Sequence, residues 1–343
     1  MLKILGASTL TTLLVIGSAR AEINGADVLP PLDSPRLHFG SGEASARGIA
    51  VYPELPNIPG EISNWTLLQW RKAYPLKPME FTRKSGQSAS FDWRSADGNT
   101  ELTVSKRGNE YVYDLIGGNG SSDGTGESDL GLSADVLPPR VSAAHALVFT
   151  MNARLSTAAA SYKTPQAKES GVVLAQGGIT FRAAFHDPES HKAYSVQLGI
   201  PLINSRNPRP EHVGCHFFGQ DRAPQLNSEK VLPGTTILPF ERDKNMRPLT
   251  FHVNDYICNI ISRPIQCMSN DGPHMTMTWP ASATDLNNWS IGSVVISIGT
   301  ENSASRQNSG GPQGDIKVGL EISDPRLVES SELFNGGRCP RHE

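Results

Sequence analysis

Planar hydrogen-bonding side chains recur on the polar sides of segments whose apolar residues alternate. They are Asn152, Arg154, Arg182, His186, Gln197, His252, Asn254, Tyr256 and Glu301. Small residues such as Gly199 and Gly299 share these positions and leave space beside them. Amide, guanidinium and imidazole groups suit the hydroxyls and carboxylates of a ligand better than the lysine, glutamate and threonine of a solvated sheet face. The pattern predicts a polar groove that binds a glycan, with a solvated or internally covered face as the alternative.

Hydrolysis of a glycosidic bond would need two carboxyl groups in this groove. Retaining enzymes place them about 5–5.5 Å apart and inverting enzymes about 6.5–9.5 Å apart. The strand-borne candidates are Glu301, Glu321 and Asp255. Asp255 falls on the apolar side of its segment or at its end, where burial would raise the pKa of its carboxyl and suit it to act as an acid.

Elimination beside the carboxylate of an acidic sugar would use other members of the set. That reaction needs a group that neutralises the carboxylate and a group that carries the proton. Arg154, His252 and Tyr256 are the catalytic candidates for it. Asn152, Arg182, His186, Gln197 and Asn254 are the candidates for substrate binding. The residue types are similar to those of jelly-roll polysaccharide lyases, as an analogy of residue types alone.

Exposed tryptophans are the usual stacking platforms for sugar rings. Trp65 and Trp70 lie in a polar, loop-like neighbourhood and are the platform candidates, with buried packing as the alternative. Trp289 begins an apolar strand and is expected in the core.

No metal or nucleotide motif is present in the sequence. Neither the pair His186 and His191 nor the pair His212 and His216 lies on an expected helix, and all four are expected to be loop residues. We therefore predict no resident cofactor. Calcium binding by Asp123, Glu127 and Asp129 is the alternative, although their spacing differs from the EF-hand pattern.

The first 21 residues have the pattern of a secretory signal peptide. Lys3 precedes a mainly apolar stretch over residues 4–17, and Ala19-Arg20-Ala21 is a small-x-small cleavage site. Removing residues 1–21 takes Lys3 and Arg20 away, so the net charge of −3 becomes −5. A mildly acidic chain has no electrostatic reason to bind nucleic acid. No later stretch is long and apolar enough for a membrane span, so we expect a secreted or periplasmic protein.

An even number of cysteines, Cys215, Cys258, Cys267 and Cys339, is typical of disulfides in an exported chain. Three connectivities can be drawn. We predict Cys258–Cys267, since Arg263-Pro264 can turn the chain between them. Cys215–Cys339 would then tie the C-terminal tail to the body.

Most of the chain that positions the candidate binding and catalytic side chains has the alternating pattern of β-strands. The composition, with 32 glycines, 25 prolines and 19% charged residues, excludes a coiled coil, a collagen and a basic nucleic-acid-binding domain. A short helical turn is expected near residues 64–72. Alternation of apolar and polar residues predicts strands at 100–105, 110–116, 146–155, 179–186, 194–200, 249–256, 293–301 and 316–322. The polar turns at 106–109 and 187–192 predict hairpins.

These strands predict an all-β fold, an antiparallel β-sandwich of jelly-roll type with an additional N-terminal β region. The expected order is the signal peptide at 1–21, the N-terminal β region at 22–116, a Gly/Ser-rich linker or long loop at 117–133, and the sandwich at 134–343. The N-terminal region is either a small domain or extra strands of the same sandwich. The hexapeptide Ala-Asp-Val-Leu-Pro-Pro occurs at 26–31 and again at 134–139, just after the Gly/Ser-rich stretch.

The sequence thus predicts a secreted carbohydrate-active protein that binds a polysaccharide and cleaves it as a glycoside hydrolase or lyase. The alternative is a non-catalytic glycan-binding or adhesive envelope protein. A structural component that uses the polar face as a protein interface is a third interpretation.

Overall fold

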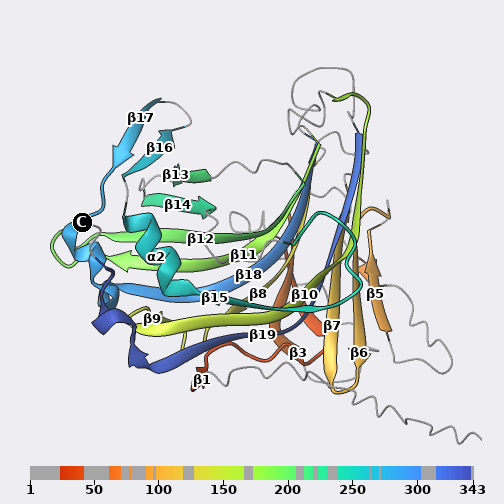
Figure 1. Cartoon of the computed structure of the whole chain (residues 1–343), viewed down its shortest axis with the longest axis horizontal. Helices are drawn as coiled ribbons and strands as arrows, with labels where there is room; N and C mark the ends of the chain where they lie inside the picture. The colour runs from red at the N-terminus through yellow and green to blue at the C-terminus, as the bar shows by residue number, and fades with distance from the viewer. Residues whose placement is uncertain are drawn as a thin grey trace, which may run out of the picture.

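The computed structural model describes most of the chain beyond the expected signal peptide. The described residues are 24–41, 62–70, 77–78, 90–95, 98–118, 127–165, 173–205, 212–218, 223–229, 238–262, 264–269, 272–302 and 314–340. They form two large sheets, A and B, and a few short helices (Figure 1).

Sheet A has eight described strands, in the order β15-β10-β19-β7-β6-β5-β4, with β1 beside β19. All of its neighbouring strands are antiparallel. Their bounds are β1 (Gly25–Asp27), β4 (Lys77–Pro78), β5 (Ser90–Arg94), β6 (Glu101–Arg107), β7 (Glu110–Gly118), β10 (His145–Tyr162), β15 (Arg247–His252) and β19 (Gly314–Leu333).

Sheet B has eleven described strands, in the order β17-β16-β13-β14-β12-β11-β18-β8-β3-β2, with β9 beside β18. The pairs β2·β3, β12·β14 and β13·β16 are parallel and the other pairs are antiparallel. Their bounds are β2 (Arg36–Ser41), β3 (Ile62–Trp70), β8 (Glu127–Asp135), β9 (Val141–Ser142), β11 (Val173–His186), β12 (Ala193–Asn204), β13 (His212–Phe218), β14 (Ala223–Glu229), β16 (Ile265–Ser269), β17 (Gly272–Met277) and β18 (Trp289–Asn302).

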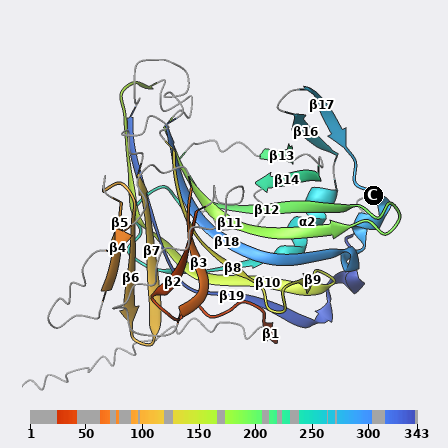
Figure 2. The same ribbon diagram turned by 180° about the vertical axis from the view of Figure 1, so that it is seen from behind.

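The two sheets pack face to face around one apolar core, and both bend strongly along their strands (Figures 1 and 2). Alternate residues of β10 and β11 meet in this core: the Phe149 and Phe181 rings touch edge to face with centroids 5.5 Å apart. Phe251 of β15 adds a third ring. Each fully buried side chain of this size contributes about 1.5–3 kcal/mol. The predicted all-β, jelly-roll-like sandwich is confirmed.

Short helices close the end of the sandwich near the C-terminus. They are α2 (Val253–Ile261), η3 (Ala281–Thr284), η4 (Leu286–Asn288) and η6 (Phe334–Gly337). Phe185, Trp279 and Trp289 pack together beneath them, and the Trp279 indole donates to the Ile260 carbonyl of α2. The predicted core position of Trp289 is confirmed, since it is 1% exposed. In the described part of the chain, no helix is long and apolar enough to cross a membrane.

Most of the predicted strands are present and longer than expected. The segments 146–155, 179–186, 194–200, 293–301 and 316–322 lie within β10, β11, β12, β18 and β19, and the expected apolar residues of β10 and β11 are buried. The turn at 187–192 joins β11 to β12 in a hairpin. The turn at 106–109 joins β6 to β7, where Gly108 has φ +61°, which glycine adopts at little cost.

The prediction of one strand over 249–256 is wrong. Strand β15 ends at His252, and α2 begins at Val253. Val253, Tyr256, Ile257 and Ile260 are spaced by three and four residues, and all are buried. This is the period of an amphipathic helix, which the two-residue alternation of the preceding strand had masked.

The helical turn expected near residues 64–72 is also wrong, because residues 62–70 form strand β3. Trp65 and Leu67 alternate with Thr66 and point into the core, and Leu67 pairs with Leu132 of β8. The period of two prevails because an antiparallel neighbour satisfies the backbone of β3.

Strands from the N-terminal part belong to the same two sheets as those that follow. Strand β7 lies between β6 and β19, and β8 lies between β3 and β18. Residues 127–133 of the expected linker are therefore the first part of β8, and residues 119–126 lie outside the described residues. The two hexapeptide copies also meet, since the Leu137 N–H donates to the Val28 carbonyl at 2.7 Å.

The predicted disulfide connectivity is wrong. Cys258 on α2 is bonded to Cys339, so the tail is tied to this helix. A neighbouring backbone bond, from Cys339 N–H to the Thr284 carbonyl, holds the tail at the same place. Cys215 and Cys267 are Cα partners in the parallel pair β13·β16. Proximity along the chain favoured Cys258–Cys267, whereas the position of α2 over the tail decides the pairing.

Candidate functional site: a polar groove on sheet B

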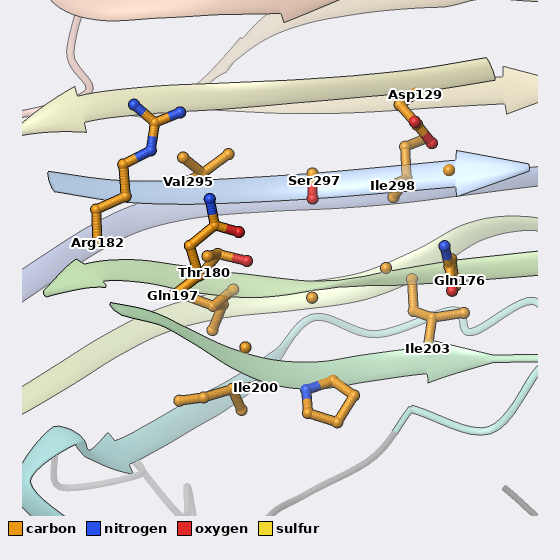
Figure 3. A pocket seen from close by; sticks show the side chains of 16 residues that line it. Asp129, Gln176, Thr180, Arg182, Gln197, Ile200, Ile203, Val295, Ser297 and Ile298 are labelled. Atoms are coloured by element: carbon orange, nitrogen blue, oxygen red, sulfur yellow. The ribbon is translucent and has the colours of Figure 1, made fainter. Parts of the chain in front are cut away.

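A depression runs along the face of sheet B that is turned away from sheet A. Because Ile179 and Phe181 of β11 point into the core, Thr180 and Arg182 point out of the sandwich. Neighbouring strands supply the rest of the lining, and the cavity volume is about 360 Å³ (Figure 3). We call this depression the sheet B groove. Its outward-facing polar residues are Asp129, Gln176, Thr180, Arg182, Gln197 and Ser297.

The register places these side chains in rows across β12, β11 and β18. Arg182 pairs with Gln197, Thr180 lies between Gly199 and Val295, and Gln176 is opposite Gly299. Arg182 and Gln176 are six positions apart on one strand, about 20 Å at ~3.3 Å per residue. Arg182 therefore lies at one end of the groove, with Asp129 and Gln176 at the other (Figure 3).

Glycines make the floor of the groove. The register between β11 and β12 shifts at Gly177 and Gly178, which is a bulge. A Cβ atom added to Gly178 would lie 2.4 Å from the Ile200 carbonyl oxygen, so the two strands approach more closely there than any other residue allows. The glycines therefore leave the backbone of the groove floor uncovered, and the hydrogen-bonding side chains stand around it.

The chemistry of this lining is that of a hydroxyl-binding surface. The amides of Gln176 and Gln197 both donate and accept, the hydroxyls of Thr180 and Ser297 do the same, and Arg182 only donates. Asp129 supplies a carboxyl. Among the described residues, no group of three His, Cys, Asp or Glu side chains could hold a metal ion. Of the alternative calcium ligands, Asp129 lies in β8 and Asp123 lies outside the described residues.

The structure brings together two of the predicted binding residues, Arg182 and Gln197, as register partners in this groove. His186 continues the same side of β11 and is exposed. The Arg140 Nη1 donates a hydrogen bond of 3.3 Å to its Nε2. Glu301 follows Gly299 by two positions on β18 and pairs with Glu127 of β8, but its side chain lies outside the described residues.

Two further predicted residues lie on the opposite side of the molecule. Asn152 and Arg154 belong to β10, so they project from the outer face of sheet A. Asn152 donates to the Ser323 hydroxyl, and Arg154 forms a 2.5 Å ion pair with Glu321. The expectation of one face that joins them to Arg182 is wrong, because alternation fixes the side of a strand but not the sheet to which the strand belongs.

The outer face of sheet A has a row of paired charges. Arg154, Glu321, Asp114 and Thr103 are successive register partners on β10, β19, β7 and β6. Arg107 makes a second ion pair with Glu321, at 2.6 Å, and the Ser156 hydroxyl donates to Asp114 at 2.6 Å. Burial raises the pKa of the Asp114 carboxyl to about 6, and the charges of Glu321 and Glu101 add to this rise. Here the charged groups satisfy one another.

The predicted residues around α2 do not form a site with the others. Tyr256 is buried in the core, and Asn254 is fully engaged by the backbone: its amide donates to the Ala143 and His145 carbonyls and accepts from Leu147 N–H. His252 ends β15 and is exposed. Asp255 is exposed as well, so the expectation of a buried carboxyl there is wrong.

The platform role expected of Trp65 is wrong too. Its side chain is fully buried, and its indole donates to the Pro30 carbonyl at 2.8 Å. Trp70 ends β3 as the register partner of Asp129, and its side chain lies outside the described residues.

Sequence reasoning missed Gln176, Thr180, Ser297 and Asp129. The expected strand begins at Ile179, whereas β11 begins at Val173 and continues through the bulge at Gly177 and Gly178. Thr180 and Ser297 lie on the polar side of their segments, as many surface hydroxyls do. Asp129 lies in the segment expected to be a linker or long loop, and only the pairing of β8 with β18 places it beside Gly299.

No family model and no curated protein matches the chain. Solved structures do match. A family 11 xylanase from Neocallimastix patriciarum is 6% identical over 77% of this chain and 100% of the xylanase, with a TM-score of 0.33. A thermostable cellulase derived from a cellulase of Rhodothermus marinus is 10% identical over 76% and 99%, with a TM-score of 0.33.

A family 11 carbohydrate-binding module from Clostridium thermocellum, solved with a mixed-linked tetrasaccharide, is 8% identical over 77% of this chain and 100% of the module. Its TM-score is 0.24.

Proposed function

We propose that this protein binds a glycan in the sheet B groove. The observation that carries the proposal is the composition of the groove: a glycine floor edged by amide and hydroxyl groups, with a guanidinium at one end. A polysaccharide presents many hydroxyls, each a donor and an acceptor, along an extended chain. Gln176, Gln197 and Ser297 supply matching donors and acceptors in rows, and the floor lets the sugar ring approach the sheet.

Binding is favoured over the elimination reaction considered from the sequence. Of the residues assigned to that reaction, Arg154 projects from sheet A, Tyr256 is in the core and His252 ends β15. A proton carrier and a carboxylate-binding group must reach the same sugar unit. Arg154, Tyr256 and His252 lie in three different places and cannot contact one sugar unit together.

Hydrolysis is the second candidate function, on one observation. Gly299 pairs with Asp129 and, two positions along, Glu301 pairs with Glu127. Two neighbouring rows of β8 and β18 thus carry three acidic residues at one end of the groove, and hydrolysis needs two carboxyls near the scissile bond. The variants Glu301→Gln and Glu127→Gln test this: each should stop release of reducing ends while leaving binding intact.

We also propose that the protein works outside the cell, after cleavage behind Ala21. The bond between Cys258 and Cys339 supports this, because structural disulfides persist in oxidising compartments. Edman sequencing of the secreted protein should start at Glu22.

The proposal is tested with residues 22–343 on a panel of soluble polysaccharides. Affinity gel electrophoresis measures binding, while reducing ends and the absorbance of unsaturated products report cleavage. Ser297→Trp fills the groove and should abolish retardation in the gel. Thr250→Trp places the same side chain on an exposed site of β15, on the other sheet, and should bind as wild type.

A second variant covers the case in which Ser297→Trp unfolds the protein. Gln176→Ala with Gln197→Ala removes two hydrogen-bonding side chains without adding bulk and should weaken binding about tenfold or more. The proposal fails if no polysaccharide is retarded, or if both groove variants bind as tightly as Thr250→Trp.

A further inference from the structure

The Arg182 end of the groove carries a cluster of nitrogen groups. Arg182 and His186 lie on the same side of β11, separated by Ala184, and both are exposed. Arg140 reaches His186 from the segment before β9 and donates from Nη1 to its Nε2 at 3.3 Å. This contact holds a guanidinium beside an imidazole. We call Arg140, Arg182 and His186 the basic end.

The basic end has no anionic partner within the described part of the chain. Its three side chains enter none of the ion pairs there, which involve other arginines. The nearest carboxyl in sequence, Asp187, is occupied: it accepts from the hydroxyls of Ser190 and Ser282, and these bonds lower its pKa. Asp135 is separated from Arg182 by Ser293 on the strand between them.

The opposite end of the groove has the opposite character. Asp129 and Gln176 lie there, about 20 Å from Arg182 along β11. The uncharged middle between the two ends is made of Thr180, Ser297 and the glycine floor (Figure 3). A ligand that spans the groove therefore contacts hydroxyl-binding groups along the middle and a guanidinium group at one end.

We propose that the ligand is an acidic polysaccharide, bound with a sugar carboxylate at Arg182 and the hydroxyls of neighbouring sugar units over the middle of the groove. The inference rests on the proposed glycan binding and adds the substrate class. A guanidinium presents two parallel N–H donors that match a carboxylate, and this pairing is stronger than a neutral hydrogen bond. Gln197, the register partner of Arg182, can hold a hydroxyl of the same sugar unit.

The test uses glycans in matched acidic and neutral forms. The pairs are polygalacturonate with its full methyl ester, carboxymethyl cellulose with hydroxyethyl cellulose, and glucuronan with its carboxyl-reduced form. Affinity electrophoresis and calorimetry on residues 22–343 compare wild type with Arg182→Gln. The control is Lys317→Gln, which removes the same charge from an exposed position of β19 on the other sheet.

The acidic member of at least one pair should bind about tenfold or more tightly than its neutral partner. Arg182→Gln should remove that preference, because the acidic form loses its carboxylate partner, while Lys317→Gln keeps the preference. Added salt should weaken the binding of the acidic form and leave the binding of the neutral form unchanged.

The inference is overturned if wild type binds acidic and neutral forms equally. It is also overturned if Arg182→Gln and Lys317→Gln lose the same affinity for the acidic form. Either result leaves glycan binding itself standing when Ser297→Trp still abolishes it. Absence of binding to every member of the panel overturns the proposed function together with the inference.

Discussion

Replacing Asp114 by asparagine should stabilise the protein at neutral and alkaline pH. The Asp114 carboxyl lies between Glu321 of β19 and Thr103 of β6, and burial raises its pKa to about 6 from an ordinary value of 3.8. Arg154 offsets part of this rise, but it is already paired with Glu321. Asparagine has nearly the same shape and can still accept from the Ser156 hydroxyl.

The sign follows from linkage between protonation and folding. A carboxyl whose pKa is higher in the folded state gives stability that is fully present below the unfolded pKa and is lost as the pH rises through about 6. A difference of about two pH units corresponds to about 3 kcal/mol at full strength. Because Asp114 is half-buried and reachable by water, we expect about 1–2 kcal/mol.

Urea unfolding followed by tryptophan fluorescence measures this effect, since Trp65, Trp93 and Trp289 are buried. Asp114→Asn should match wild type at about pH 3 and exceed its free energy of unfolding at about pH 8, with most of the change between about pH 4 and 6, the interval between the unfolded and folded pKa values. Asp315→Asn, at an exposed position of β19, is the control and should show no such pH-dependent gain. A constant difference across this range would refute the reasoning.

Three predictions concern the covalent and polar ties at the closed end of the sandwich. Asn254→Ala should cost about 2–4 kcal/mol in urea unfolding, because it leaves buried backbone groups unpaired; Asn254→Asp retaining full stability would contradict this. Replacing Cys258 and Cys339 together by alanine should cost about 4 kcal/mol, since their bond closes a loop with a sequence separation of 81. Cys215 and Cys267 should form the second disulfide, and peptide mapping without reductant should recover them as one linked peptide.

The sequence was sufficient for most of the strands and for two of the six polar groove residues. Alternation identified β10, β11, β12, β18 and β19, because one face of each is buried and its period of two is uninterrupted. Arg182 and Gln197 were predicted for the same reason. Their position opposite one another depends on pairing, which the hairpin at 187–192 made readable.

The remaining part of the site depends on long-range pairing. Nothing in the local sequence tells that Arg154 belongs to sheet A and Arg182 to sheet B, because both follow the same alternation. Asp129 reaches the groove only because β8 pairs with β18, more than 150 positions away in the chain. Asn254 looked like a ligand-binding amide, and only the fold shows that backbone groups occupy it.

The order of strands across the two sheets has a consequence for how the chain matures. The last long strand, β19, lies between β10 and β7 in sheet A, and β18 lies between β11 and β8 in sheet B. While the chain is being synthesised or exported, β7, β8, β10 and β11 therefore present open hydrogen-bonding edges until residues 289–333 arrive. Such edges bind other unfinished chains. Neither sheet can close before residues 289–333 are available, and a truncation before residue 289 would remove a central strand from both sheets.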